Sequence, residues 1–492
     1  MITIEHAKER VREAGGEELL ERLEHLDRTR DERRGQGRGA ANDPHGGGGG
    51  RPPDRGAHSD FDVVIAGGGL SLLIAPLLAA RGLRVAVVDR ARIGATHREW
   101  NASGPELQRL VEGGLFTTEE VAELVVARYS GGVCRWYGGG SYPVTGVLDH
   151  AVDAGGLLAA TRAQAEARGV RLLDFHELAG HTEGSSGVAL RVKTPACGAL
   201  ALSARVLVDA RGAASPYASA DLLCPTVGGV ISGLEQGDGE DQIRADEGEI
   251  LATTEHVEEG RQHLWEAFPG RIGETTVYLF YYAKAADVGS GSLLRLYARF
   301  FDRLGRYKRG EGRLIQPTFG YIPGWSRLGP APAAPGPRVA LVGDAAARHS
   351  PLTFCGFGAM LRSFAPAAEA LARAASAETI HTHALASITH DAPIHAGTGA
   401  LARLMAAPSR APARAGEVNA LLDDAFAVLH GMGNEAYAAL LRDEMPMPDY
   451  VRFLRTVAAR RPQVYREVVG LMGAIAVGRW GLSIGRELFR AS

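Results

Sequence analysis

The chain has 492 residues, enough for about three domains of ordinary size. Hydrophobic residues make up 45% and charged residues 23%, so neither a disordered nor a fibrous chain fits. The formal net charge is −3, and a chain so close to neutral has no overall field that would gather nucleic acid. Four cysteines at wide spacing favour neither a zinc ribbon nor a disulfide framework, so the default expectation is a reducing, cytoplasmic compartment.

The first 59 residues divide into a charged segment and a glycine-rich one. Residues 3–34 are predicted to form a helix that packs on the body of the protein, because four leucines recur at helical spacing. The segment 1–34 holds ten acidic and eight basic residues and no apolar centre, so it does not resemble a secretory signal. Residues 35–59 include five consecutive glycines and are predicted to be a flexible linker.

A nucleotide-binding pattern begins at residue 61. The apolar segment Phe61–Ala66 is predicted to be a buried strand and runs directly into Gly67, Gly68 and Gly69. A helix-compatible run follows to about residue 81. The next apolar segment, residues 84–88, is predicted to be a second strand. This order of strand, glycine turn, helix and strand is typical of a dinucleotide-binding unit.

Each part of this pattern has a physical role. Gly67 permits the tight turn, and Gly69 lets the backbone approach a pyrophosphate at the helix N-terminus. Asp89 ends the second strand and is placed to accept hydrogen bonds from a ribose. Leu72 stands where a third glycine is usual, so the helix is expected to lie slightly off the strand.

Two later segments fit the same domain. Residues 204–212 form an apolar strand pattern that ends in Asp209 and Gly212. Residues 338–346 form another, which contains Gly343 and Asp344. A long alanine-rich helix is predicted to follow from about residue 356 to 375.

The remaining segments have other periodicities. Within 225–330, the runs 262–269 and 275–282 alternate with period two and predict an antiparallel sheet with one face on a cavity or core. The expected division is an N-terminal helix (1–34), a linker (35–59), the first part of the nucleotide-binding domain (60–224), a substrate domain (225–330), the second part of the nucleotide-binding domain (331–375) and a helical region (376–492).

The helical region carries one apolar run and several histidines. Residues 468–477 are apolar without interruption, but the run is too short to span a bilayer. Burial in the protein is the leading interpretation, and an interfacial or lid helix with peripheral membrane contact is the alternative. The histidines between residues 381 and 395 match no ligand spacing, so no metal is expected.

Together, these motifs resemble those of the FAD-dependent oxidoreductases of the p-hydroxybenzoate-hydroxylase-like class. A closer resemblance, from about residue 61 to the C-terminus, is to the Cru-type lycopene cyclases and their paralogues. The segments that carry it are Arg98–Asn101, Leu148–Asp153, Leu264–Pro269 and Ser350–Gly358. The resemblance implies an α/β fold: a Rossmann-type FAD-binding domain, an inserted antiparallel β-sheet substrate domain and a C-terminal helical region.

The class implies FAD as the cofactor. Gly343 and Asp344 would meet the pyrophosphate and the ribityl chain. The helix that opens near Gly356 would aim its N-terminus at the flavin, where it stabilises negative charge. The implied FAD-binding residues are Gly67, Gly68, Gly69, Asp89, Arg90, Arg98, Gly212, Gly343, Asp344, Pro351, Gly356, Phe357 and Gly358.

Cyclisation of a lycopene-like polyene needs an acid, stabilisation of a carbocation and exclusion of water. Glu266 is the candidate catalytic acid, because it lies in an apolar segment where burial raises a carboxyl pKa. The alternative is a structural carboxylate held by a partner. Aromatic residues that could line a polyene tunnel or simply pack in the core are Trp265, Phe268, Tyr278, Phe280 and Tyr282.

Other functions remain open. A flavin monooxygenase or a polyprenyl reductase would use NAD(P)H as a transient reductant, since only one dinucleotide fingerprint is present, or a separate electron donor. A halogenase is disfavoured, because Trp325 stands alone rather than in a Trp-x-Trp-x-Ile-Pro stretch. The non-enzymatic alternative is a paralogue that binds FAD and a hydrophobic small molecule without turnover.

Overall fold

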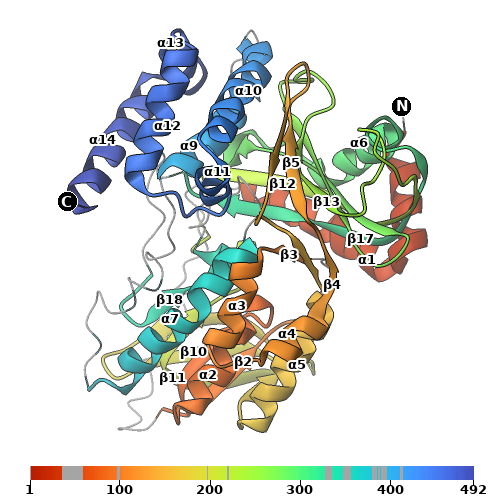
Figure 1. The fold of residues 1–492 in the computed structure, drawn as a ribbon. Helices are drawn as coiled ribbons and strands as arrows, with labels where there is room; N and C mark the ends of the chain where they lie inside the picture. Colours follow the sequence, from red (N-terminus) through yellow and green to blue (C-terminus); the bar gives the residue numbers. More distant parts are fainter. Residues whose placement is uncertain are drawn as a thin grey trace.

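The computed structural model describes residues 2–35, 59–96, 100–196, 198–218, 221–326, 328, 335–346, 356–378, 380, 385, 388, 396–409 and 414–491. Arg98 and Pro351 of the predicted FAD set lie outside these ranges, as do the histidines between 381 and 395. Figure 1 shows the nucleotide-binding half at the bottom, with a large sheet and the C-terminal helices above it.

The lower half is built on a seven-stranded sheet. Its strands lie in the order β8-β2-β1-β11-β10-β9, and β18 pairs with β11. Strand β1 lies between β2 and β11 and is parallel to both, and its apolar residues suit a strand covered on both faces. The bounds are β1 (Phe61–Ala66), β2 (Val85–Val88), β8 (Arg171–Leu173), β9 (Glu177–Glu183), β10 (Val188–Lys193), β11 (Ala199–Asp209) and β18 (Val339–Leu341).

Helices and a β-arm cover the two faces of this sheet. One face packs against helices in a common apolar core, and on the other face β9 and β10 fold over the parallel strands. The covering helices are α2 (Ile74–Ala80), α3 (Gly104–Glu112), α4 (Thr118–Leu124), α5 (Ala154–Ala167) and α7 (Gly356–Ser376). The helix after the glycine turn begins with the 3₁₀ turn Leu70–Leu73, in which Leu72 is fully buried.

The upper half is an eight-stranded sheet, in the order β16-β12-β15-β14-β13-β5-β6 with β17 paired to β12. Its strands are antiparallel except for the pair β5 and β13. Strands β5 and β6 come from the segment predicted to belong to the nucleotide-binding domain. The bounds are β5 (Gly131–Arg135), β6 (Ser141–Val144), β12 (Leu222–Leu234), β13 (Glu247–Ala252), β14 (His263–Pro269), β15 (Glu274–Tyr281), β16 (Ala283–Lys284) and β17 (Gly310–Gly324).

A small three-stranded sheet lies between the two halves (Figure 1). Its middle strand is β7 (His150–Val152), which pairs with β3 (Trp100–Ala102) and β4 (Val125–Arg128). Asp149, just before β7, accepts a hydrogen bond from Gly104 N at 2.9 Å. This contact ties the small sheet to the start of α3.

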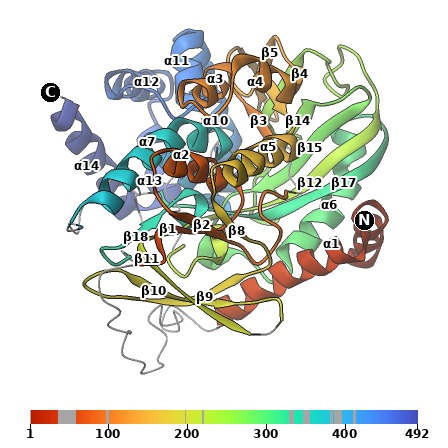
Figure 2. The ribbon, with the colours of Figure 1, turned by 90° about the horizontal axis from the view of Figure 1, so that it is seen from below.

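The predicted N-terminal helix is confirmed. Helix α1 (Ile4–Gly35) bends at Gly16 and lies beside α6 (Ser292–Tyr307) on one face of the large sheet (Figure 2). Asp27 of α1 accepts hydrogen bonds from Leu293 N at 3.1 Å and Leu294 N at 3.2 Å, and one from the Tyr321 hydroxyl. The carboxylate therefore caps α6 from a helix far away in the sequence.

Replacing Asp27 by Ala is expected to lower the free energy of unfolding by roughly 2–4 kcal/mol, because a helix cap is lost and a buried hydroxyl loses its acceptor. Urea unfolding of the full chain measures this. Asp31→Ala is the control, because Asp31 accepts a single hydrogen bond, from Gly291 N at 3.3 Å, and a smaller loss is expected. Equal losses in the two variants would contradict the capping role.

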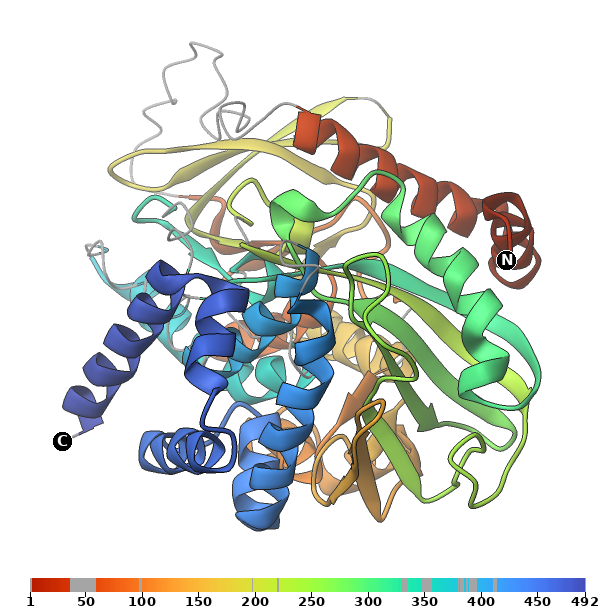
Figure 3. The ribbon, with the colours of Figure 1, turned by 90° about the horizontal axis from the view of Figure 1, so that it is seen from above.

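The C-terminal helices cover the other face of the large sheet (Figure 3, blue beside green). The predicted apolar run 468–477 is not one element: it breaks at Gly473 into two helices bent by 114°. In the described part of the chain, no single helix is long and apolar enough to cross a membrane. The bounds are α9 (Ala396–Met405), α10 (Ala415–Gly431), α11 (Asn434–Leu441), α12 (Met447–Arg460), α13 (Val464–Met472) and α14 (Ala474–Ala491).

Candidate functional site

Four parallel strands end side by side at one edge of the seven-stranded sheet. Ala66 at the end of β1 is level with Val88 of β2 and Asp209 of β11, and Asp209 is level with Leu341 of β18. In open α/β sheets, ligands bind outside the carboxyl ends of the strands. The sequence segments predicted to meet at a nucleotide therefore do converge.

The glycine turn after β1 has the properties that a bound nucleotide requires. Gly67 has φ 121°, and a Cβ there would overlap the carbonyl oxygen of Ala210. Only glycine fits this crossing of β1 and β11. At Gly69, in contrast, an added Cβ would meet no atom within 4 Å among the residues that the structure describes. The space next to Gly69 is thus open for a ligand to approach the backbone.

Asp89 follows β2 and lies beside the same turn. Its Oδ2 accepts a hydrogen bond from Gly68 N at 2.6 Å, and its Oδ1 accepts one from Ala91 N at 2.8 Å. These bonds orient the half-buried carboxylate at the strand edge, where a ribose would reach it. Arg90 is exposed next to it.

The second and third segments meet each other directly. Gly212 has φ 61° and Gly343 has φ 63°, so both turns use a conformation that favours glycine. A Cβ at Gly212 would lie 3.7 Å from the Cβ of Asp344. Asp209 is fully buried and accepts hydrogen bonds from the Arg211 guanidinium at 2.8 and 3.1 Å. Asp209 is therefore a structural residue of the turn.

The segment Gly356–Gly358 opens α7, as predicted. Phe357 is buried, and its ring stacks on that of Trp100 with centroids 4.9 Å apart. Gly358 lies against Glu106 of α3, because a Cβ at this position would overlap the carboxylate. This contact supplies a packing reason for Gly358. The predicted approach of Gly356 and Gly358 to the flavin stays a prediction.

A buried ion pair that the sequence analysis did not single out holds the start of α7. Glu106 is 2% exposed and pairs with Arg362. It also accepts a hydrogen bond from Ser103 N at 2.9 Å, as part of a capping box at the start of α3. The spacing Ser103-x-x-Glu106 is the signal from which this residue could have been found.

These observations fit FAD. The strand edge offers an oriented carboxylate for a ribose, an open backbone position for a pyrophosphate and two further glycine turns that close around the same point. Gly67, Gly69 and Asp89 would hold the adenine-nucleotide half, and Gly343 and Asp344 the ribityl side.

Glu266 lies in the large sheet, in the fully buried strand β14. It is 3% exposed and level with Tyr278 of β15. Its Oε1 has no hydrogen-bond partner among the described residues, so the alternative of a structural carboxylate held by a partner finds no support there. Burial raises the pKa of Glu266 well above its usual value and so favours the protonated, uncharged carboxyl group.

The predicted aromatic residues divide between the two faces of the sheet. Phe268, Phe280 and Tyr282 belong to the apolar core on the face of Glu266, and Tyr278 packs against that core. Trp265 lies on the opposite face, beneath α6, with its ring stacked on Tyr307 at a centroid distance of 4.7 Å. Trp265 therefore does not share a wall with Glu266.

Two buried cysteine thiols lie on the same face of the large sheet as Glu266, in an apolar core. Cys134 of β5 and Cys224 of β12 flank β14 on either side in the sheet and belong to the same core. Burial raises the pKa of Cys134 to about 12, so its thiol is neutral and poorly nucleophilic. The core around Glu266 is thus apolar and closed to water.

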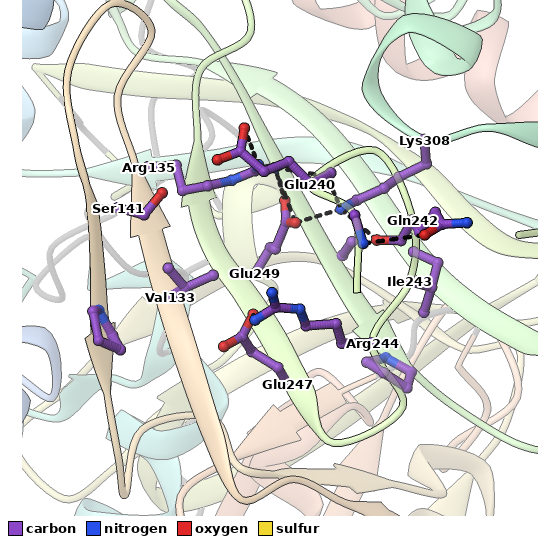
Figure 4. A pocket seen from close by; sticks show the side chains of 14 residues that line it. Val133, Arg135, Ser141, Glu240, Gln242, Ile243, Arg244, Glu247, Glu249 and Lys308 are labelled. Atoms are coloured by element: carbon purple, nitrogen blue, oxygen red, sulfur yellow. Dashed lines mark hydrogen bonds and ion pairs between the residues drawn. The ribbon is translucent and has the colours of Figure 1, made fainter. Parts of the chain in front are cut away.

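The opposite face of the sheet has a polar cavity of about 230 Å³ (Figure 4). At its base, Glu249 accepts hydrogen bonds from Arg135 at 2.9 and 3.0 Å, from the Tyr307 hydroxyl at 2.7 Å and from Lys308. Glu249 is therefore both ion-paired and hydrogen-bonded, whereas Glu266 Oε1 has no hydrogen-bond partner among the described residues. The sheet therefore separates a structural ion cluster from an unpaired, protonated acid.

The wild type is expected to lose stability as pH rises, because of Glu266, and the Glu266→Gln variant is expected to lack this loss. The folded protein keeps the Glu266 proton, whereas the unfolded chain releases it above a pKa of about 4.3. Between these two pKa values the folded state binds more protons, so the free energy of unfolding falls as pH rises, by up to about 1.4 kcal/mol per pH unit. Glutamine has no proton to lose, and the variant should gain on the wild type as pH rises.

Urea unfolding at about pH 5 and about pH 8 measures this difference. Glu249→Gln is the control, because it weakens the pairing of the buried Lys308 and Arg135 and should cost roughly 3–5 kcal/mol at both pH values. A gap between wild type and Glu266→Gln that does not change with pH would show that Glu266 is ionised when folded.

Among the described residues, no group of three or more histidine, cysteine, aspartate or glutamate side chains is arranged to hold a metal ion.

Neither a family model nor a curated protein matches this sequence, but many solved structures match its fold. A geranylgeranyl bacteriochlorophyll reductase-like protein from Thermoplasma acidophilum is 15% identical, with a TM-score of 0.53, and the match covers 84% of this chain and 99% of the other. The halogenase PltM is 14% identical, with a TM-score of 0.56, over 87% and 99%. The anhydrotetracycline hydroxylase OxyS from Streptomyces rimosus is 18% identical, with a TM-score of 0.50, over 78% and 75%.

At these identities the likeness concerns the fold. The chain has the Rossmann-type α/β fold of the FAD-dependent flavoenzymes, with a helical C-terminal region. A further PltM structure holds FAD together with phloroglucinol, and it matches this chain with a TM-score of 0.53. The predicted fold class is confirmed.

Proposed function

We propose that the protein is an FAD-dependent flavoenzyme that protonates a carbon–carbon double bond of a hydrophobic isoprenoid or carotenoid, as in lycopene cyclisation. The single observation that carries this proposal is Glu266: a buried carboxyl group without a hydrogen-bond partner in the described chain, on an apolar and aromatic face of the sheet. A protonated acid in a dry site is what the addition of a proton to an unactivated alkene needs.

The proposed reaction has no net redox change. The Glu266 carboxyl group gives its proton to a terminal double bond, and the resulting carbocation closes the ring. A neighbouring carbon then returns a proton to the Glu266 carboxylate, which restores the acid. Phe268, Tyr278 and Phe280 share the face of Glu266, and their π faces would stabilise the cation. Reduced FAD, when bound, would supply negative charge that favours a cation.

The other residues of the chain would bind and orient. The three glycine turns and Asp89 hold the nucleotide, and the pair Glu106–Arg362 positions the start of α7. The buried core around Cys134 excludes water, which would otherwise quench the cation.

Expression in a lycopene-accumulating host tests the proposal. Pigments with ring ends, separated by chromatography, support cyclisation. Unchanged lycopene, with flavin bound to the purified protein, would contradict cyclisation of this substrate and leave the non-catalytic paralogue as the better account.

Reduction of a polyprenyl chain is the second candidate. It is favoured by the match to a reductase-like protein over 84% of this chain and 99% of the other, and a reductase needs the same acid to deliver a proton after hydride transfer. Consumption of NAD(P)H, or of reducing equivalents from a separate donor, with saturation of double bonds would support it. NAD(P)H consumption coupled to oxygen uptake would instead indicate a monooxygenase.

A further inference from the structure

The last two helices expose apolar side chains that do not pack in the protein core. Helices α13 and α14 form a V with a bend of 114°. Their exposed apolar residues, here called the α13–α14 surface, are Tyr465, Val469, Ile475, Leu482 and Leu488. Ile475 is 76% exposed and Leu482 is 66% exposed. These two residues are seven positions apart and therefore lie on one face of α14.

The same surface carries positive charge. Arg466 lies beside Tyr465 on α13, and Arg479 and Arg486 each follow an exposed apolar residue of α14 by four positions. Arg466 and Arg486 have no ion-pair partner within the described ranges. Long arginine side chains next to apolar ones can place their guanidinium groups at a lipid headgroup while the apolar groups enter the acyl boundary.

The opposite faces of these helices are anchored in the protein. Val468, Leu471 and Ala476 belong to the same apolar core as Phe268 and Phe280, beside Glu266. Figure 2 shows α14 at the periphery, extending away from the other helices. The α13–α14 surface is thus the outer side of the helical layer whose inner side faces the candidate acid.

We propose that the α13–α14 surface docks on an anionic lipid bilayer. Apolar residues, a tyrosine and unpaired arginines on an outward-facing helix pair are the composition that an interfacial helix needs. Docking would bring a lipid-soluble substrate to the core that holds Glu266, and only this last step rests on the proposed function. The bend of 114° means that the two helices do not form one straight apolar span.

Sedimentation of the purified full chain with vesicles tests docking without any substrate. We expect binding to phosphatidylcholine vesicles that contain about 30% phosphatidylglycerol to be about tenfold tighter than binding to phosphatidylcholine alone. Ile475→Asp with Leu482→Asp should weaken both by about tenfold or more, because two charges enter the apolar contact. Both positions are exposed, so thermal unfolding should stay unchanged.

Matched controls distinguish vesicle binding by the α13–α14 surface from non-specific adsorption. Ile272 and Phe175 are exposed apolar residues elsewhere, at 106% and 57%, and their replacement by Asp should leave vesicle binding unchanged. Arg466→Gln with Arg486→Gln should remove the preference for phosphatidylglycerol and keep the weak binding to phosphatidylcholine.

Three outcomes would overturn the proposal. The wild type does not sediment with either vesicle, the aspartate variants bind as well as the wild type, or light scattering shows a dimer that the aspartate variants abolish. The last result would assign the surface to a second copy of the chain. Because no turnover is measured, failure here leaves the proposed chemistry at Glu266 standing.

Discussion

Glu266→Gln is expected to lower the rate of product formation by about 10²–10⁴-fold, because the substitution removes the proton donor and changes little else. Glutamine has nearly the shape of a protonated glutamate. The folded protein already holds Glu266 without charge and without a hydrogen-bond partner among the described side chains, so no ion pair is broken. The variant should fold and bind flavin as the wild type does.

The measurement is ring-bearing product, or saturated product for a reductase, per flavin-loaded protein. Glu247→Gln is the matched control, since Glu247 lies on the neighbouring strand β13, lines the cavity on the other face of the sheet and should be dispensable. Full activity of Glu266→Gln with its flavin retained would remove Glu266 from the reaction and with it the main support for the proposed chemistry.

The nucleotide-binding edge could be predicted from sequence because its signals are local. A strand, a glycine turn, a helix and a second strand ending in an acid lie within 30 residues of one another, and the right-handed parallel crossover then leaves few arrangements. The ends of β11 and β18 are far apart in sequence, but each carries the same pattern of an apolar strand followed by glycine. The Glu106–Arg362 pair was not predicted, because its partners are 256 positions apart.

The environment of the acids could not be predicted in the same way. Glu249 and Glu266 both lie in buried strands, and the sequence does not show which of the two acids gains hydrogen-bond partners. The difference comes from the end of α6, which brings Tyr307 and Lys308 to Glu249 from 58 and 59 positions away. For the same reason, the sequence analysis grouped Trp265 with Phe268 as candidate tunnel residues, whereas Trp265 lies on the face of the sheet that α6 covers.

Gly69→Ala is expected to weaken flavin binding by about tenfold or more, which corresponds to about 1.4 kcal/mol, because an added Cβ would occupy the space that the ligand approaches. An added Cβ at Gly69 meets no atom of the described residues within 4 Å, so a loss of affinity would point to a clash with the ligand. Gly67→Ala differs, because its Cβ overlaps Ala210 and would destabilise the turn itself.

Quenching of flavin fluorescence gives the affinity, and thermal unfolding of the apoprotein gives its stability. Gly305→Ala in α6 is the control: its Cβ also meets nothing within 4 Å, and alanine is the better helix former, so stability should rise slightly with flavin affinity unchanged. Should Gly69→Ala bind flavin as tightly as the wild type, the pyrophosphate does not approach this turn. The convergence of β1, β2, β11 and β18 would then serve packing alone, and the assignment of the nucleotide site would have to be abandoned.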